Sequence, residues 1–274
     1  MRLLLNADDL GYTPLINQSI FELHHQGRLF STSLIVNLPH SRDAIDALCT
    51  YPSLNVGMHL NLTRGRPLLP CKQISSLVNT HGEFWATKTF FARALAGRIS
   101  LSEVEAELSA QIEYLLDSGL LPTHLDSHSH WHVLPHMRQL VLQLAKRYQI
   151  PGIRQTSLRR TLLPSVLWLK AVPTNKHRQT EFSIPDYLLS LHLWMDSNGM
   201  PEDLFFSDRI QRLVSRPDIT LEMVSHPGKA DDPDFPQDSL TAQQRQLEYD
   251  FLLSVRFGKW IETTNAVFSS YKGL

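Results

Sequence analysis

The sequence feature that most restricts the fold is an alternation of short apolar runs with longer amphipathic stretches in the first half of the chain. Short apolar runs between polar residues are typical of buried parallel strands, and apolar residues every three or four positions are typical of helices. The predicted strands cover residues 3–5, 31–36, 54–62, 123–126, 152–154 and 220–224. The predicted helices cover residues 14–26, 39–48, 103–118 and 134–148, and a last one opens near residue 241. This alternation predicts an α/β fold with a parallel sheet or barrel and helices outside it.

Local signals mark the ends of two of these helices. Thr13 followed by Pro14 is typical of an N-cap residue before a first helical turn. Gly27 suits the left-handed conformation that often ends a helix. Ser102 and Glu105 have the spacing of a capping box, which predicts that the next long helix begins at Ser102.

The residues between about 156 and 217 interrupt the alternation, with many leucines, prolines and basic residues but no regular period. A chain of 274 residues with 42% hydrophobic residues is suited to one packed domain. We therefore expect a single domain over residues 1–274 with an elaborated region at 156–217, interpreted as a lid or a dimer contact. Its leucine-rich part, residues 162–168, fits either a homodimer interface or the core of the monomer.

Charge and cysteine content exclude several classes of partner. The formal net charge is -1, from 26 basic and 27 acidic residues, which argues against binding to nucleic acid. The most apolar stretch, residues 162–172, is too short and too interrupted to cross a membrane, and the first residues turn polar too early for a signal peptide. Cys49 and Cys71 lack CxxC spacing, so we expect a reduced, cytoplasmic protein, with a disulfide between them as the alternative.

Polar residues gather directly after the predicted strands, where α/β folds build their sites. Asp8 and Asp9 follow the first strand. Since neighbouring residues of an extended chain point to opposite sides, these two carboxylates should differ in environment. One could bind a cation while the other takes a proton, although the same segment also fits a simple turn before Gly11.

Histidines follow three later strands. His59 lies on the polar face of its strand, where it is either a ligand or a structural residue. Four histidines and an aspartate fall within residues 124–132, a density that favours a site for zinc or another divalent metal over a solvated loop. The even spacing puts them on one side of an extended chain, but a loop before Leu134 would turn some away. His226 precedes a Pro-Gly pair that fixes it at a strand end, as a functional or a turn residue.

Together these groups fit a hydrolytic metal site better than each does alone. Such a site takes three protein ligands and keeps one position for water, and Asp9, His59 and His128 could supply the ligands from three strand ends. Asp8 would remain as a general base and His226 as a general acid. These are the groups that metal-assisted amide hydrolysis requires.

The same segments resemble the YdjC-like family, which includes chito-oligosaccharide deacetylases. The matching segments cover nearly the whole chain in order, and Asn-Ala-Asp-Asp together with His-Leu-Asp-Ser-His is the specific part; they are residues 6–11, 57–59, 124–132 and 226–228, with further likeness at 32–33, 65–67 and 152–154. Leu10 departs from the phenylalanine expected there, and Ser129 and Trp131 fall where the family varies. These departures leave the shape of the pocket, and so the sugar, open.

The resemblance implies a distorted (β/α) barrel related to polysaccharide deacetylases, one divalent metal ion on Asp9, His59 and His128, and removal of acetyl groups from N-acetylated sugars. We expect magnesium or zinc, since a mixed Asp-His-His set suits several ions. Arg154 could orient Asp8 or lie on the surface. Trp131 could stack on a sugar or belong to the core. Asp126 and His130 are candidates to support the metal-bound imidazoles.

Two other functions fit parts of the pattern. A metal-dependent phosphoesterase also uses histidines and aspartates, but its binuclear form needs more bridging carboxylates than Asp8, Asp9 and Asp126 readily provide. A non-catalytic sugar-binding barrel would not need both an acid and a base. The sequence has no Gly-x-Ser-x-Gly elbow and no glycine-rich phosphate loop, which argues against a serine hydrolase and against a nucleotide cofactor.

Overall fold

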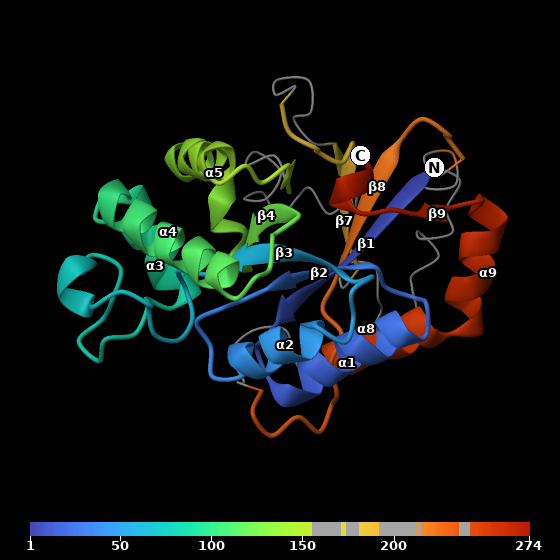
Figure 1. Cartoon of the computed structure of the whole chain (residues 1–274), viewed down its shortest axis with the longest axis horizontal. Helices are drawn as coiled ribbons and strands as arrows, with labels where there is room; N and C mark the ends of the chain where they lie inside the picture. The colour runs from blue at the N-terminus through green and yellow to red at the C-terminus, as the bar shows by residue number, and fades with distance from the viewer. Residues whose placement is uncertain (155–170, 174–180, 192–211, 213–214, 236–241) are drawn as a thin grey trace.

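A computed structural model of the chain describes residues 1–154, 171–173, 181–191, 212, 215–235 and 242–274 (Figure 1). Within these residues one sheet contains nine strands in the order β5-β4-β3-β2-β1-β8-β7-β6, and β9 pairs with β1. The neighbours from β5 to β7 in this order are all parallel, while β6 and β7 are antiparallel. The strands are β1 (Arg2–Leu10), β2 (Ser31–Leu34), β3 (Asn55–Leu60), β4 (His124–Ser127), β5 (Gly152–Ile153), β6 (Ala171–Pro173), β7 (Tyr187–Ser190), β8 (Thr220–Ser225) and β9 (Val267–Phe268).

The two edges of the parallel sheet approach each other through the segment that leads into β7. Gly152 of β5 forms a parallel bridge with Ser183, and the backbone N–H of Ile153 donates to the Ser183 carbonyl at 3.1 Å. A few residues later the same segment pairs with β8 as β7. The expected distorted (β/α) barrel is therefore confirmed, with one strand that serves two neighbours in turn.

Helices cover the outside of the sheet (Figure 1). Helices α1, α2 and α8 lie on one side of it, and α3, α4 and α5 lie around β3 and β4. The described helices and 3-10 segments are α1 (Pro14–His25), α2 (Ser41–Leu48), η1 (Cys71–Gln73), α3 (Thr87–Leu95), α4 (Leu101–Asp117), η2 (His128–Val133), α5 (Pro135–Arg147), α8 (Ala242–Leu253), α9 (Val255–Thr264) and η6 (Tyr271–Gly273).

The strand β1 is the central element of the sheet and is longer than its apolar run predicts. Only Arg2 of its nine residues is exposed, because β2, β8 and β9 pair with it and helices pack outside. Its second half is polar, yet Asn6, Asp8 and Asp9 are each at most 1% exposed. Buried polar groups need partners. The partners of these residues form the site described below.

The helix-end predictions are confirmed at α1 and wrong at α4. Thr13 Oγ1 accepts from the Ile16 backbone N–H at 3.1 Å, and Gly27 has a φ of +66° just beyond the helix. The helix α4 starts earlier than its proposed capping box, with Ser100 as N-cap. The Glu105 carboxylate does not reach back to Ser102 but accepts from Arg147 Nη2 of α5 at 2.5 Å. A tertiary contact thus replaces the reciprocal local bond.

The elaborated region at 156–217 lies largely outside the described residues, and so does the leucine-rich part at 162–168 that was expected in an interface or core. Where the region is described, β6 and β7 form an antiparallel pair at one end of the sheet order. Neither strand was expected.

Cys49 and Cys71 are free thiols, so the alternative of a disulfide is wrong. Among the described helices, none has the length and apolar character needed to span a membrane.

Candidate active site

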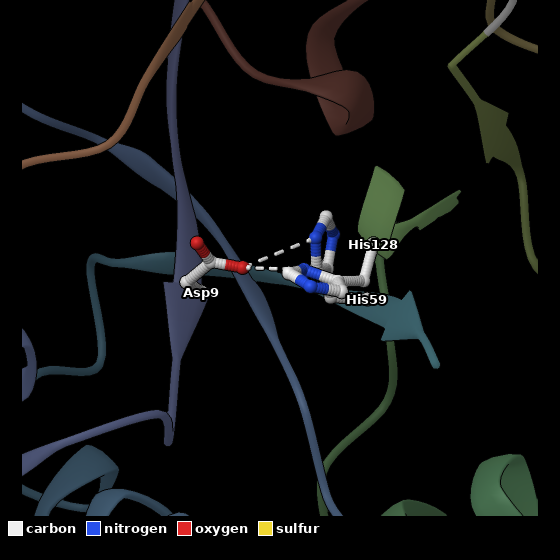
Figure 2. A group of neighbouring side chains, drawn as sticks. All are labelled: Asp9, His59 and His128. Carbon is white, nitrogen blue, oxygen red and sulfur yellow. Dashed lines mark hydrogen bonds and ion pairs between the residues drawn. The ribbon is translucent and has the colours of Figure 1, made fainter. Parts of the chain in front are cut away.

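The candidate site lies where the parallel strands end, and three side chains from different strands converge there (Figure 2). His59 is near the end of β3, His128 directly follows β4, and Asp9 lies near the end of β1. Asp9 Oδ1 lies 3.4 Å from His59 Nε2 and 3.1 Å from His128 Nδ1. One donor atom from each residue falls within 4.8 Å of the other two, so the group could hold a metal ion.

The spacing of these atoms suits a single small cation. Two donors that are each about 2.1 Å from one ion lie about 3.0–3.4 Å apart in octahedral or tetrahedral geometry. The two Asp9–imidazole distances, 3.4 and 3.1 Å, fall in that range. A set of two imidazoles and one carboxylate suits zinc and other divalent metals. The predicted ligand set is therefore brought together in the fold.

An irregular backbone at Asp9 aims its side chain. Asp9 has a φ of +72°, and the pairing of β1 with β2 shifts register between Ala7 and Leu10. A non-glycine residue in this region is strained by about 1–3 kcal/mol and persists only where its surroundings fix it. The irregularity breaks the strand alternation, so Asp8 and Asp9 do not point to opposite sides as expected. Both approach His59 Nε2, at 4.0 and 3.4 Å.

Two further side chains orient the candidate ligands. His59 Nδ1 hydrogen-bonds Asp126 Oδ1 at 2.8 Å, which leaves Nε2 turned toward Asp9. A carboxylate behind a ligating imidazole is the usual support in metal sites. On the other side, Arg245 Nη2 donates to Asp9 Oδ2 at 2.5 Å and leaves Oδ1 for the imidazoles. The expected place of Asp126 is thus seen, while Arg245 was not anticipated.

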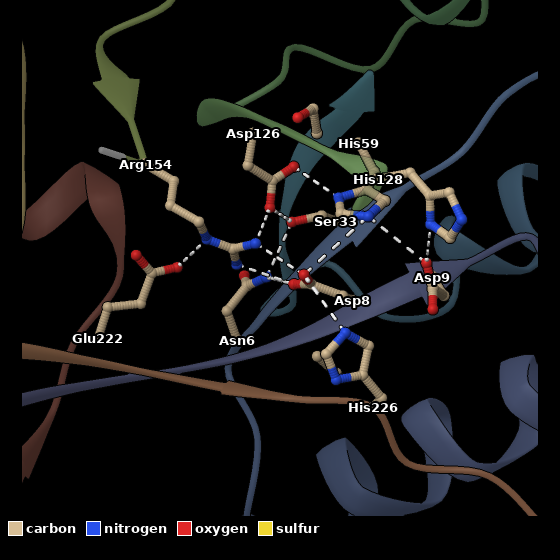
Figure 3. A network of polar contacts seen from close by, with 12 residues as sticks. Asn6, Asp8, Asp9, Ser33, His59, Asp126, His128, Arg154, Glu222 and His226 are labelled. Atoms are coloured by element: carbon tan, nitrogen blue, oxygen red, sulfur yellow. Dashed lines mark hydrogen bonds and ion pairs between the residues drawn. The ribbon is translucent and has the colours of Figure 1, made fainter. Parts of the chain in front are cut away.

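Asp8 belongs to a separate, fully buried ion-pair cluster (Figure 3). Arg154 donates to both of its oxygens, from Nη1 at 2.7 Å and from Nη2 at 2.8 Å. Asn6 Nδ2 adds a bond to Asp8 Oδ1 at 2.9 Å. The guanidinium also reaches Asp126 at 2.6 Å and Glu222 at 2.8 Å. Arg154 is therefore buried in the barrel interior and does not lie on the surface.

This cluster argues against a second metal ion. Asp8, His59 and Asp126 also bring donor atoms together. However, Arg154 Nη1 lies 2.7 Å from Asp8 Oδ2 and 2.6 Å from Asp126 Oδ2, so a guanidinium already supplies the positive charge between the two carboxylates. A binuclear phosphoesterase site would need those carboxylates for its second ion.

His226 stands opposite the metal-site histidines, with Asp8 between them (Figure 3). Its Nε2 lies 3.9 Å from Asp8 Oδ2, and its side chain is 16% exposed, as is that of His128. Glu248 of α8 accepts from the His226 backbone N–H at 2.7 Å and so holds the turn in place. His128 and His226 therefore flank Asp8 and Asp9 on the side that solvent can reach.

The charges of the site follow from burial and close pairing. Burial alone would raise the pKa of Asp8, but Arg154 and then His59 lower it below its ordinary value. Asp9 behaves in the same way, since Arg245 and the two imidazoles hold its pKa well below the usual range against the effect of burial. Burial opposes the protonation of His59, yet Asp126 and Asp8 raise its pKa to about 10. Both aspartates are thus ionised, and the surrounding carboxylates favour a positive charge at His59.

Two predicted residues of the histidine-rich segment take other places. Trp131 is fully buried and packs edge-on near Phe90, so it is a core residue and the stacking hypothesis is wrong for this structure. The chain turns at Ser129 and His130, whose φ values are +61° and +53°, and this ends the extended run. Among the described residues, no hydrogen bond joins His130 to a candidate ligand, and its Nδ1 is buried without one. His130 therefore does not support an imidazole as expected.

Several residues of the site gave no clear sequence signal. Arg245 and Glu248 lie on α8, far from any motif, and contact the site only through packing of that helix. Glu222 lies within an apolar strand, and a charged residue in an otherwise buried strand is the one signal that could have been noticed. Ser33 lies in a segment that the family resemblance includes but had no assigned role; its Oγ donates to Asp126 at 2.7 Å and accepts from Asn6 at 2.8 Å.

Comparison with known proteins identifies relatives whose described activity agrees with the geometry of this site. The family model described as "YdjC-like protein" matches residues 2–263. The chain belongs to the YdjC-like family. A carbohydrate deacetylase of Oceanobacillus iheyensis is 30% identical over 264 residues, which cover 96% of this chain and 100% of that relative. A carbohydrate deacetylase of Geobacillus stearothermophilus is 34% identical over 230 residues, which cover 84% of this chain and 80% of that relative.

A solved structure of Enterococcus faecalis V583, described as a proposed cellobiose-phosphate cleavage protein, has the same fold. It matches this YdjC-like chain with a TM-score of 0.80 at 29% identity, covering 99% of this chain and 97% of that one. The fold and the family resemblance inferred from the sequence are therefore both confirmed.

Proposed function

We propose that this protein is a metal-dependent carbohydrate deacetylase that hydrolyses the acetamide of N-acetylated sugars such as chito-oligosaccharides. The observation that carries the proposal is the placement of two distinct groups side by side. One is the Asp9–His59–His128 cluster, whose atoms could hold a metal ion. The other is Asp8, an ionised carboxylate whose two oxygens both accept from Arg154. The relatives named carbohydrate deacetylase support the same activity.

Asp9, His59 and His128 would hold one divalent ion, with magnesium or zinc as the first candidates. When bound, such an ion acidifies water and polarises the acetyl carbonyl. Asp126 fixes the His59 ring by accepting from Nδ1, and Arg245 fixes Asp9 through Oδ2. These contacts leave His59 Nε2 directed toward Asp9 Oδ1, which also lies 3.1 Å from His128 Nδ1.

Asp8 is the proposed general base. It is ionised, since Arg154 and His59 keep its pKa low, and its Oδ2 lies 4.0 Å from His59 Nε2 beside the metal cluster. A water bound beside the metal cluster would be within reach of the carboxylate. Arg154 keeps Asp8 in one orientation through two bonds and so limits the rotation that would misalign proton transfer.

His226 is the proposed general acid. An amine leaves readily only if it is protonated as the C–N bond breaks, so the reaction needs a proton donor on the side of the leaving nitrogen. His226 lies on the side of Asp8 that faces away from the metal cluster (Figure 3). Its Nε2 is 3.9 Å from Asp8 Oδ2.

The direct test is acetate release from N-acetylglucosamine oligomers of increasing length. Protein stripped of metal should be inactive, and restoring one divalent ion per chain should restore release. His128→Ala should lose both metal and activity. His136→Ala, on α5 and outside the site, is the matched control and should retain both.

Other outcomes distinguish the alternatives. Binding of one ion per chain without acetate release from any acetylated sugar would favour a non-catalytic sugar-binding barrel. Hydrolysis of phosphate esters with two ions per chain would favour the phosphoesterase. The position of Arg154 between Asp8 and Asp126 speaks against the latter.

We also propose that residues 1–274 form one domain, since the matching family model covers residues 2–263. A cytoplasmic location is consistent with the free thiols of Cys49 and Cys71. A homodimer, and the absence of nucleic acid or membrane partners, stay predictions.

A further inference from the structure

The C-terminal segment closes the end of the barrel opposite the site. The strand β9 pairs with the start of β1, and Arg2 Nη1 donates to the Gly273 carbonyl at 3.0 Å. Tyr271 of η6 is fully buried, and its ring stacks on His124 of β4 with centroids 4.0 Å apart and planes inclined by 16°. The last residues thus insert an aromatic ring beneath the barrel interior.

Gly152 leaves space for the Tyr271 ring because it has no side chain. A Cβ at that position would lie 2.5 Å from Tyr271 Cδ1 and 2.7 Å from the Thr123 carbonyl oxygen, distances that no side chain tolerates. Any larger residue at position 152 would displace either the ring or strand β4. The glycine that precedes Arg154 by two residues therefore serves the placement of Tyr271.

A continuous chain of polar contacts leads from this ring to the proposed base. Tyr271 Oη donates to Glu222 Oε2 at 2.8 Å. Glu222 Oε1 accepts from Arg154 Nε at 2.8 Å. Arg154 in turn donates to both oxygens of Asp8 from its two terminal nitrogens, at 2.7 and 2.8 Å. Every member is at most 1% exposed, so no solvent competes for these bonds.

We propose that Tyr271 and Glu222 are positioning residues for the deacetylation, which fix the Arg154 guanidinium and thereby the orientation of Asp8. The inference rests on the proposed deacetylase function. Arg154 Nε has one partner, Glu222, while the terminal nitrogens serve Asp8 and Asp126. Within the part of the chain that the structure describes, the planar guanidinium is thus held at its Nε edge by Glu222, and Glu222 is held at its other oxygen by Tyr271.

The electrostatics of Glu222 are consistent with this role. Burial raises its pKa to about 7, against the lowering effects of Arg154 and of the Tyr271 hydroxyl. A hydroxyl that donates to a carboxylate favours its ionised form. Loss of that donor would leave a buried carboxylate oxygen without a partner and weaken the anchor for Arg154.

The experiment compares Tyr271→Phe, Glu222→Gln and the double variant with the metal-loaded wild-type enzyme. Tyr271→Phe removes only the hydroxyl and keeps the ring on His124. We expect kcat to fall about three- to tenfold, as for partial loss of a hydrogen bond to a charged group, with KM and metal content unchanged. Glu222→Gln should lower kcat at least as much. The double variant should be no slower than Glu222→Gln, because the hydroxyl acts only through that carboxylate.

Tyr148→Phe is the matched control. It removes a tyrosine hydroxyl that donates to Glu113 at 2.5 Å on the outer surface, so kcat should not change. An unchanged kcat in Tyr271→Phe, with or without a lower melting temperature, would show that the Tyr271 hydroxyl has no positioning role and would overturn the inference. Additive losses in the double variant would overturn it as well. A wild-type enzyme that releases no acetate would refute the proposed function and this inference together, whereas the first two results leave the function intact.

Discussion

The contrast between Asp8 and Asp9 gives the sharpest prediction from this structure. The two residues are adjacent in sequence and similarly buried, but they have different partners. Asp9 Oδ1 faces His59 and His128, whereas Asp8 is held by Arg154 and Asn6. Replacing each aspartate by asparagine changes the charge by the same amount at neighbouring positions. A difference in turnover or metal content between the two variants therefore reflects the different roles of Asp8 and Asp9 and not the loss of charge alone.

For Asp8→Asn we expect one bound ion per chain and a large loss of turnover. An amide cannot take up the proton of the attacking water, and a general base typically contributes about 10² to 10⁴ in rate. This factor corresponds to about 3–5 kcal/mol in the activation free energy. For Asp9→Asn we expect loss of the ion itself, because Oδ1 is the atom shared by both imidazoles.

The cost of Asp8→Asn in folding stability should be moderate. The amide can still accept from one terminal nitrogen of Arg154, so one charged hydrogen bond is lost, which is worth about 1.5–3 kcal/mol. The guanidinium keeps Asp126 and Glu222, which limits the penalty of an unpaired charge.

The assay combines acetate release, metal analysis after dialysis, and thermal unfolding of both variants beside the wild type. The reasoning is refuted if Asp8→Asn keeps kcat within about tenfold of the wild type, since a general base contributes more than that. It is also refuted if Asp8→Asn loses the ion while Asp9→Asn retains it, because the two roles would then be exchanged.

Four further predictions follow from individual contacts. His226→Ala should lower kcat about 10²-fold or more while the ion stays bound, as acetate release and metal analysis would show; unchanged turnover would remove it from the acid role. Trp131→Ala should lower the free energy of unfolding by about 3–5 kcal/mol without loss of metal, because the side chain is wholly in the core; a selective loss of sugar affinity would restore the stacking hypothesis. Glu222 has a folded pKa of about 7 against 4.5 for an ordinary glutamate, so the native state binds its proton more tightly. The stability from this group is fully present below about pH 4.5 and lost as pH rises through about 7. The difference in unfolding free energy between wild type and Glu222→Gln should therefore change by up to about 3 kcal/mol over that window in chemical denaturation, and a flat difference would contradict the assignment. Loading of metal at pH 7 should release about one proton per chain, because the pKa of His59 is about 10 and a ligating imidazole must be neutral. Calorimetry in buffers of different ionisation enthalpy measures the number of protons released. The absence of proton release would speak against His59 as a ligand.

Much of the fold could be predicted because the signals are local. The local strand signals at β2, β3, β4 and β8 and the Thr13-Pro14 start of α1 need no knowledge of distant residues. The start of α4 was misplaced because Ser100 and not Ser102 is the N-cap, and Glu105 binds Arg147 of α5, a contact between segments remote in sequence. The strands β6, β7 and β9 were missed for a similar reason. They are short and are defined by the partners that pair with them.

The candidate ligands could also be proposed from the sequence, because parallel strands deliver the residues that follow them to one edge of the sheet. The supporting residues could not. Arg245 reaches Asp9 from a helix 236 residues later in the chain, and Tyr271 reaches Glu222 from the C-terminal segment. Strand alternation failed at Asp9 because an irregular pairing with β2 turns its backbone to a positive φ.

The sequence by itself determined most of the strand–helix alternation in the first half of the chain, the family, and the chemical identity of the groups at the strand ends. These properties follow from short-range periodicity and from residue type. Only the tertiary structure decided that Asp8 and Asp9 both face His59, that Arg154 is buried among three carboxylates, and that Trp131 belongs to the core. Which groups share a buried space depends on how the sheet curves and which helix packs beside it. In that space the partner of a charge, more than its residue type, sets whether it binds a metal, takes a proton or holds another residue in place.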